Sequence, residues 1–183
     1  MMIIKTLKIN ELKIPKWGVT SILRPEKMLL KLSMIESGWL QPIVVRTADN
    51  TIIDGFHRCE IALEDPKFIK KHGVLVPVVY HDVSEIEAMI VHVRLNRSRG
   101  SVNSYALSKL VKRIVSSGLY EENDLCDILL MHDDEIDVLM ANGLLKKKNW
   151  QKYEYSRAWV PIEVANPSQR DTVVVERPPN ADR

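Results

Sequence analysis

A β-branched run that ends in Asp-Gly places the strongest constraint on the fold of this chain. In the segment Ile52–Arg58, Asp54 and Gly55 close the run, and His57 and Arg58 follow at the expected start of a helix. Glycine lets the backbone approach a ligand closely, and the free amides and dipole of a helix N-terminus favour an anion. The imidazole and the guanidinium would add charge-assisted donors. The segment therefore predicts a strand-to-helix turn that binds an anion.

The same turn also has a purely structural interpretation. Asp54 would then cap the helix, Arg58 would be a solvated surface residue, and His57 would pack against a neighbour. Short motifs of this kind often occur without a ligand. The segments around the turn therefore have to decide between the two interpretations.

The neighbouring segments alternate between strand and helix patterns. Strands are expected over residues 3–9, 42–46, 51–54 and 74–80, with the second and third joined in a hairpin. Helices are expected over about residues 25–37, 55–64, 84–95, 103–117, 122–131 and 134–142. Pro25 begins the first helix, Ser84 and Glu87 form a capping box, and Asn103 caps the fourth helix. The first helix carries apolar residues at helical spacing, namely Met28, Leu29, Leu32 and Ile35.

This order of elements predicts an α/β (α+β) fold, with a small mixed sheet and flanking helices followed by a helical appendage. We expect a first domain at residues 1–100, the appendage at 101–148, and an aromatic segment with a disordered polar tail at 149–183. A chain of 183 residues with 45% hydrophobic residues is long enough for one such domain and a small appendage.

Composition excludes several classes of protein. The net charge of +2, from 26 basic and 24 acidic residues, does not by itself indicate a nucleic-acid or membrane partner. Cys59 and Cys126 favour neither a disulfide framework nor a metal site, so a reducing cytoplasm is the expected compartment. No apolar stretch is long enough to span a membrane. We therefore expect a cytoplasmic protein with no membrane partner and no metal-ligating residues.

A second polar segment, Arg94–Gly100, is dense in arginine. Arg94, Arg97 and Arg99 bring guanidinium groups together with Asn96, which offers both donors and acceptors. Such a density suits a polyphosphate better than a single carboxylate. The alternative is that these arginines are solvated and interact only with the dipole at the end of their helix.

Flanking motifs carry a resemblance to a known family. Ser37–Arg46 (SGWLQPIVVR) precedes the Asp-Gly turn, Val74–Tyr80 (VLVPVVY) follows it, and Leu95–Gly100 (LNRSRG) ends the next helix. In this order and with these spacings, the chain resembles the N-terminal domain of ParB-type partition proteins over about residues 8–118. The superfamily includes sulfiredoxin and free-serine kinases. The resemblance implies a fold of the ParB and sulfiredoxin type.

The ligand site that the resemblance implies can be carried over residue by residue. In ParB-like domains a Gly-x-x-Arg turn and an Asn-Arg segment hold a nucleoside triphosphate with magnesium, which implicates Gly55, Arg58, Asn96 and Arg97. His57 fits the Gly-x-His-Arg form of the sulfiredoxin and kinase branches better than the double-arginine form of partition proteins, so the base stays open between CTP and ATP. The full set of expected nucleotide-binding residues is Gln41, Asp54, Gly55, His57, Arg58, Asn96, Arg97 and Arg99.

Enzymatic activities of the superfamily can be weighed against this sequence. Sulfiredoxin chemistry requires a nucleophilic thiolate immediately before the His-Arg pair, where this chain has Phe56. Cys59 is expected to be a small core residue instead. A kinase needs a carboxylate base, for which Asp54 is available, but the loop at 14–18 lacks the acid expected there. Sulfiredoxin activity is therefore not expected, while kinase activity and slow, CTPase-like hydrolysis of a nucleotide are left open.

The helical appendage lies where partition proteins carry a helix-turn-helix, but its charge disagrees with DNA binding. Between positions 121 and 137 the chain has no lysine or arginine and eight carboxylates, namely Glu121, Glu122, Asp124, Asp127, Asp133, Asp134, Glu135 and Asp137. Such a surface would repel a duplex. It is expected either to receive a basic protein partner or only to solubilise the chain.

Any DNA contact is expected from basic residues on either side of these acidic helices. The residues are Lys109, Lys112, Arg113, Lys146, Lys147 and Lys148. The lysine run at 146–148 can equally be a solvated segment after a helix. Aromatic residues follow between Trp150 and Trp159, and we expect them to pack on the first domain rather than to stack on bases.

A shortened helical region and the Tyr155–Trp159 segment make the chain resemble the short ParB-like proteins of phages and other mobile elements. The resulting hypothesis is a nucleotide-binding regulatory module that acts on DNA or on a DNA-associated protein partner, with CTP or ATP and Mg²⁺ as ligands. The alternatives are an ATP- or ADP-dependent kinase of a free amino acid and a DNA-binding protein that needs no nucleotide.

Overall fold

A mixed four-stranded sheet forms the centre of the computed structural model, which describes residues 3–100 and 102–141. Its strands are β1 (Ile4–Lys8), β2 (Ile43–Arg46), β3 (Ile52–Asp54) and β4 (Leu75–His81), in the order β1-β4-β2-β3. β2 and β3 form the expected antiparallel hairpin, β4 runs parallel to β2, and β1 runs antiparallel to β4 at one edge. The predicted mixed sheet is therefore confirmed.

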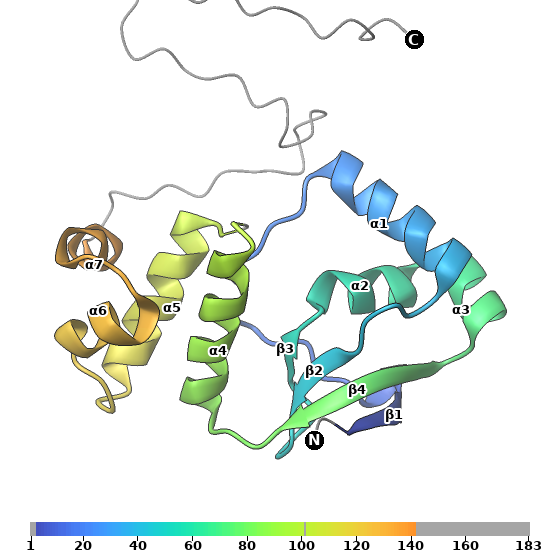
Figure 1. Ribbon diagram of the computed structural model, residues 1–183, viewed down its shortest axis with the longest axis horizontal. Coiled ribbons are helices and arrows are strands. Elements are labelled where there is room, and N and C mark those ends of the chain that lie inside the picture. The colour runs from blue at the N-terminus through green and yellow to red at the C-terminus, as the bar shows by residue number, and fades with distance from the viewer. Residues whose placement is uncertain (1–2, 101, 142–183) are drawn as a thin grey trace, which may run out of the picture.

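Three helices lie together against this sheet: α1 (Arg24–Ser37), α2 (Phe56–Glu64) and α3 (Pro66–His72) (Figure 1). The apolar side chains between them and the strands form one core cluster, which includes Ile43, Cys59, Phe68 and Val78. Strand residues alternate between the two faces of a sheet, so Val78 of β4 is buried whereas Leu75 is exposed. The apolar run at 74–80 is thus buried on one face only.

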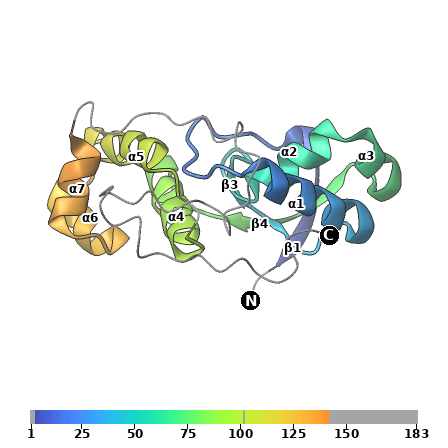
Figure 2. The same cartoon turned by 90° about the horizontal axis from the view of Figure 1, so that it is seen from above.

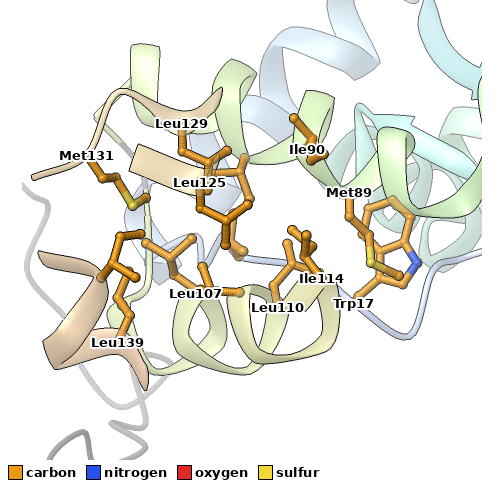
Figure 3. Packing of buried hydrophobic residues seen from close by; sticks show 14 of the residues in the cluster. Trp17, Met89, Ile90, Leu107, Leu110, Ile114, Leu125, Leu129, Met131 and Leu139 are labelled. Atoms are coloured by element: carbon orange, nitrogen blue, oxygen red, sulfur yellow. The ribbon is translucent and has the colours of Figure 1, made fainter. Parts of the chain in front are cut away.

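Four further helices gather beyond β3: α4 (Glu85–Ser98), α5 (Ser104–Ser116), α6 (Glu122–Leu129) and α7 (Asp133–Met140) (Figures 1 and 2). Figure 3 shows a second core cluster between them, in which Leu110 and Ile114 of α5 point toward Leu125 of α6 and Met89 of α4 lies beside Trp17. The predicted helical appendage is confirmed. Its cluster joins residues on both sides of position 100, and the domain boundary expected there stays a prediction.

Local capping explains where α4 and α5 begin. The Ser84 hydroxyl accepts a hydrogen bond from the amide of Glu87 at 3.2 Å, and the Glu87 carboxylate accepts one from the amide of Ser84 at 2.7 Å. The Asn103 side chain accepts a hydrogen bond from the amide of Ala106 at 3.1 Å. Both predicted caps are confirmed.

One helix was not predicted from the sequence, and another is longer than predicted. α3 was not expected, because Pro66 also marks the end of α2; the proline begins a new helix, and the Asp65 side chain accepts from the amide of Lys67 at 2.8 Å. α4 extends through Ser98, so Asn96 lies in a helical turn rather than in a polar loop.

The apolar spacing of α1 marks a face that no described residue covers well. Met28, Leu29 and Leu32 are 62%, 67% and 53% exposed, whereas the buried residue of this helix is Met34. The periodicity identifies the helix correctly but does not show which of its faces meets the core.

Residues 142–183 lie outside the described part of the chain, and so do Lys146, Lys147, Lys148, the Trp150–Trp159 aromatic residues and the polar tail. The last described helix ends at Met140. Within the described ranges, no helix is long and apolar enough to cross a membrane.

Candidate functional site

The Asp-Gly turn joins β3 to α2 in a backbone conformation that glycine adopts easily. Gly55 is the N-cap of α2 and has a φ of +96°, in the left-handed region. A Cβ atom at this position would lie 2.5 Å from Cδ1 of Ile43 and 2.9 Å from Nη2 of Arg58. The missing side chain therefore lets the start of α2, the Arg58 guanidinium and the hairpin lie close together.

The Asp54 carboxylate links the two arginine-bearing segments. It accepts hydrogen bonds from Nη1 of Arg99 at 2.6 Å and from Nη2 at 3.0 Å, and it lies 3.5 Å from Nη2 of Arg58. Burial alone would raise the pKa of Asp54, but the hydrogen bonds and charge of Arg99, with the charge of Arg58, outweigh burial and lower it. Asp54 is therefore ionised and offsets one of the two positive charges beside it.

The Arg58 guanidinium is held by the segment that leads into β2. Its Nη1 donates to the carbonyl oxygen of Gln41 at 2.7 Å and to that of Pro42 at 3.2 Å. Its side chain is only 15% exposed, so it is not the solvated surface residue of the structural alternative. The turn at Gln41, the start of α2 and the end of α4 thus converge, as the sequence predicts.

His57 presents one ring nitrogen to a carboxylate and buries the other. Nδ1 lies 3.4 Å from Oε2 of Glu60, which in turn lies 3.2 Å from Nζ of Lys27. Nε2 is buried, and it has no hydrogen-bond partner within residues 3–100 and 102–141. Burial lowers the pKa of His57, and Glu60 opposes this shift only in part. A neutral ring with its proton on Nδ1 leaves Nε2 able to accept a hydrogen bond from a ligand.

His92 is a buried residue of the cavity wall that the sequence patterns do not single out. Its Nε2 accepts from the amide of Val19 at 3.1 Å and its Nδ1 donates to the carbonyl of Ile53 at 2.7 Å, so the ring is neutral. Asn96, one turn later, donates from Nδ2 to the His92 carbonyl at 2.8 Å. A lone histidine on an apolar helix face gives no signal beyond burial, and yet it ties the segment before α1 to the site.

A cavity of about 370 Å³ lies among these groups. All the expected nucleotide-binding residues except Arg97 line it, namely Gln41, Asp54, Gly55, His57, Arg58, Asn96 and Arg99. The remaining lining comes from Thr20, Ser21, Ile22, Leu23, Glu26, Leu30, Phe56 and His92. This volume lies within the range of small-molecule sites, about 300–1,000 Å³. The cavity combines a charged part with an apolar part, which suits a ligand that has both phosphate and ring groups.

Arg97 lies outside this cavity. Its Nη2 donates to the carbonyl of Leu130 at 3.2 Å and lies 3.8 Å from Oε2 of Glu135. Residues two apart along an α-helix point in directions about 200° apart, which is why Arg97 and Arg99 reach different parts of the molecule. The nucleotide-binding role expected of Arg97 stays a prediction with no support from its position.

α4 makes a second contact with this region, at the last turn of α6. Nε of Arg94 donates to the carbonyl of Ile128 at 2.7 Å. Leu130, which ends α6, has a φ of +49° and is 85% exposed. The arginines of the 94–100 segment therefore divide between the cavity and the α6–α7 turn.

The expected DNA-binding residues that the structure describes make contacts within the chain. Arg113 pairs with Glu85 at 2.7 Å, and Lys112 donates to the carbonyl of Ala141 at 3.0 Å. Nζ of Lys109 lies 4.7 Å from the centre of the Tyr105 ring, one turn earlier in α5. All eight carboxylates between positions 121 and 137 are exposed. DNA binding and the helix-turn-helix assignment stay predictions.

The structure places Phe56 and Cys59 differently, one at the start of α2 and the other in the core. Phe56 begins α2, and Cys59 is fully buried in the core cluster of the sheet. Burial raises the pKa of the Cys59 thiol to about 12. A protonated, buried thiol is inert as a nucleophile, and Cys59 is the core residue that the sequence predicts.

Several solved structures are similar to the chain. A Pnob8-like ParB-N domain in its C2221 form has 18% identity and a TM-score of 0.48, over 64% of this chain and 46% of that chain. A C-terminally truncated ParB of Caulobacter crescentus complexed with CTP-gamma-S has 17% identity and a TM-score of 0.44, over 75% and 76%. The C-terminally truncated ParB of Caulobacter crescentus complexed to the centromeric parS site has 15% identity and a TM-score of 0.46. This match covers 74% of this chain and 70% of that chain.

No protein-family model matches the chain. It is similar in sequence to the uncharacterized protein YbdM of Escherichia coli strain K12, with 31% identity over 157 residues. The match covers 84% of this chain and 74% of that protein. Because the identity extends over most of both chains, this chain belongs to the same family as YbdM.

Proposed function

We propose that this chain is a nucleotide-binding regulatory module of the ParB type that acts on DNA or on a DNA-associated protein. The observation that carries the proposal is the meeting of Arg58 and Arg99 at one carboxylate on the cavity wall. The two arginines come from segments far apart in the sequence. Their planar guanidiniums match the geometry of phosphate oxygens, and Gly55 brings the start of a helix to the same place.

The other groups on the wall support a nucleoside rather than a bare phosphate. Leu23, Leu30 and Phe56 supply apolar surface for a ring. Nε2 of His57 and the side-chain oxygen of Asn96 can accept hydrogen bonds from hydroxyl or amino groups of the ligand. We therefore propose a nucleoside triphosphate such as CTP or ATP, accompanied by Mg²⁺, as the ligand.

The regulatory part of the proposal rests on α4. Arg99 lies at the cavity, whereas Arg94 and Arg97 on the same helix bind carbonyl groups at the α6–α7 turn. A ligand that draws Arg99 away from Asp54 would act on the helix end that holds this turn. Since the surface of α6 and α7 is acidic, we favour a basic protein as the partner over direct contact with a duplex.

Calorimetric titration with CTP, ATP, GTP and ADP, each with and without Mg²⁺, tests the ligand. We expect at least one triphosphate to bind in the presence of Mg²⁺. A folded protein that binds none of these nucleotides would contradict the proposed function. Heat of binding for one base only would also define the base preference.

A second candidate function is phosphoryl transfer from ATP or ADP to a small hydroxyl substrate such as a free amino acid. The observation that favours it is the neutral His57, whose Nε2 could take the proton of an attacking hydroxyl. Labelled nucleotide incubated with a mixture of amino acids separates the two functions, because only the second gives a phosphorylated amino acid.

A further inference from the structure

The charged groups of the cavity balance one another. Its lining contains two guanidiniums, Arg58 and Arg99, and two carboxylates, Glu26 and Asp54. His57 and His92 are both shifted toward the neutral form by burial. The formal charge of the lining near pH 7 is therefore zero, and the site is less electropositive than its arginines alone imply.

Asp54 is the carboxylate that lies nearest to the positive charges of the two arginines. Both of its oxygens accept from Arg99, and Arg58 lies 3.5 Å from one of them. A triphosphate that approaches these guanidiniums meets an ionised carboxylate in their midst, whose side chain is 9% exposed and poorly screened by solvent.

We propose that Asp54 makes the cavity selective for metal-bound phosphates over metal-free phosphates. This inference rests on the proposed nucleotide-binding function and adds to it the form of the ligand. Mg²⁺ in proteins is commonly held by one or two carboxylates together with the phosphates of a substrate. A cation carried by the ligand would turn the repulsion from Asp54 into attraction.

The surroundings of Asp54 fit such an exchange. The side chain of Arg99 is 49% exposed, so it has room to follow a phosphate away from the carboxylate. No cluster of three or more His, Cys, Asp or Glu side chains that could hold a metal occurs in the described ranges. A cation beside Asp54 would draw further ligands from the phosphates of the nucleotide.

Direct binding measurements on the full chain test the proposal. CTP, ATP and inorganic tripolyphosphate are each titrated by calorimetry in Mg²⁺ and in EDTA at constant ionic strength. For the wild-type chain we expect binding at least about tenfold tighter in Mg²⁺, the size of effect that one nearby charge produces. Equal affinity with and without Mg²⁺ would overturn the proposal while leaving the nucleotide site intact.

The variant Asp54→Asn removes the charge and keeps the shape of the side chain. We expect its metal-free affinity to rise by about tenfold or more and its preference for Mg²⁺ to disappear. Asp82→Asn is the matched control, because Asp82 is an exposed carboxylate that does not line the cavity. It should keep the wild-type preference.

Two outcomes count against the idea. If Asp54→Asn retains the wild-type ratio of affinities, Asp54 is not the selective group. If neither chain binds any of the three probes in Mg²⁺, the proposed function fails together with the inference. Circular dichroism establishes that the variant is folded, and Asp54→Ser carries the same test if the asparagine variant does not fold.

Discussion

Asp54 and Arg99 are separated by 45 positions in the sequence and form a bidentate ion pair at 2.6 and 3.0 Å. The pair fastens the end of α4 to the end of β3, so it is at once a structural link and part of the wall of the candidate site. Neither residue alone marks the site. The pair brings the Asp-Gly turn and the arginine-rich segment together in the fold.

Arg58 and Arg97 both belong to the expected nucleotide-binding motifs, but only Arg58 lines the cavity. Replacing each in turn tests whether position in the cavity decides the effect on nucleotide affinity. Arg58→Ala should weaken nucleotide binding by at least about tenfold, because a buried charge-assisted contact is lost. Arg97→Ala removes the same charge from the same motif but outside the cavity, and its affinity should stay within about threefold of wild type. Calorimetry under one set of conditions gives both values. The reverse order of effects would place the ligand next to α7 instead.

Gly55→Ala should destabilise the fold. The alanine would hold a φ of +96° with its Cβ 2.5 Å from Cδ1 of Ile43, which costs about 1–3 kcal/mol or more. Urea unfolding followed by circular dichroism measures the loss. Gly18→Ala is the control, because a Cβ there meets no atom within 4 Å. Equal stability of the two variants would show that the turn relaxes easily.

His92 should make the stability of the chain sensitive to mild acid. Burial lowers the pKa of His92 below 6.5, so between the folded and unfolded values the unfolded chain binds more protons. Its contribution to stability is therefore present above about pH 6.5 and is lost as the pH falls through the lower, folded pKa.

Urea unfolding of wild type and His92→Gln from pH 8 to pH 5 measures this contribution. The variant should be less stable at pH 8, by about 1–3 kcal/mol, because buried partners of the ring lose a hydrogen bond. It should also lose less stability on acidification than wild type. Since His57 shifts in the same direction and is present in both chains, the difference between them isolates His92. Parallel curves would contradict the prediction.

Leu130 should be replaceable by glycine with a gain in stability. It ends α6 with a φ of +49° and is 85% exposed, so the side chain contributes strain and little burial. Leu130→Gly should raise the free energy of unfolding by about 0.5–1 kcal/mol. Leu130→Ala, which keeps a Cβ, should show no such gain. A loss of stability in the glycine variant would mean that the leucine side chain is covered in solution.

The elements that local patterns define were predictable from the sequence. Short apolar runs and turn signals predict β1 to β4, and side-chain caps at Ser84 and Asn103 predict the starts of α4 and α5. α3 was missed because Pro66 serves as both a stop and a start. The exposed face of α1 was not foreseen because helical spacing marks an apolar face without showing what covers it.

The site was predictable only in outline. Motifs bring Arg58 and Arg99 to attention, but that both meet Asp54 depends on tertiary distances that no spacing rule contains. Arg97 fits its motif, yet the helix turns it toward α7. His92 has no sequence signal at all, because its role consists of two backbone partners that lie far away in the sequence.

The division of the arginines along α4 has a thermodynamic consequence. If a nucleotide changes the affinity of the α6–α7 surface for a partner, the partner must change the affinity for the nucleotide by the same factor. If the nucleotide strengthens partner binding, a chain that carries its partner would retain nucleotide at concentrations at which the isolated chain has none bound. The segment from Arg94 to Arg99 would in that case couple nucleotide binding in the cavity to partner binding at the α6–α7 surface.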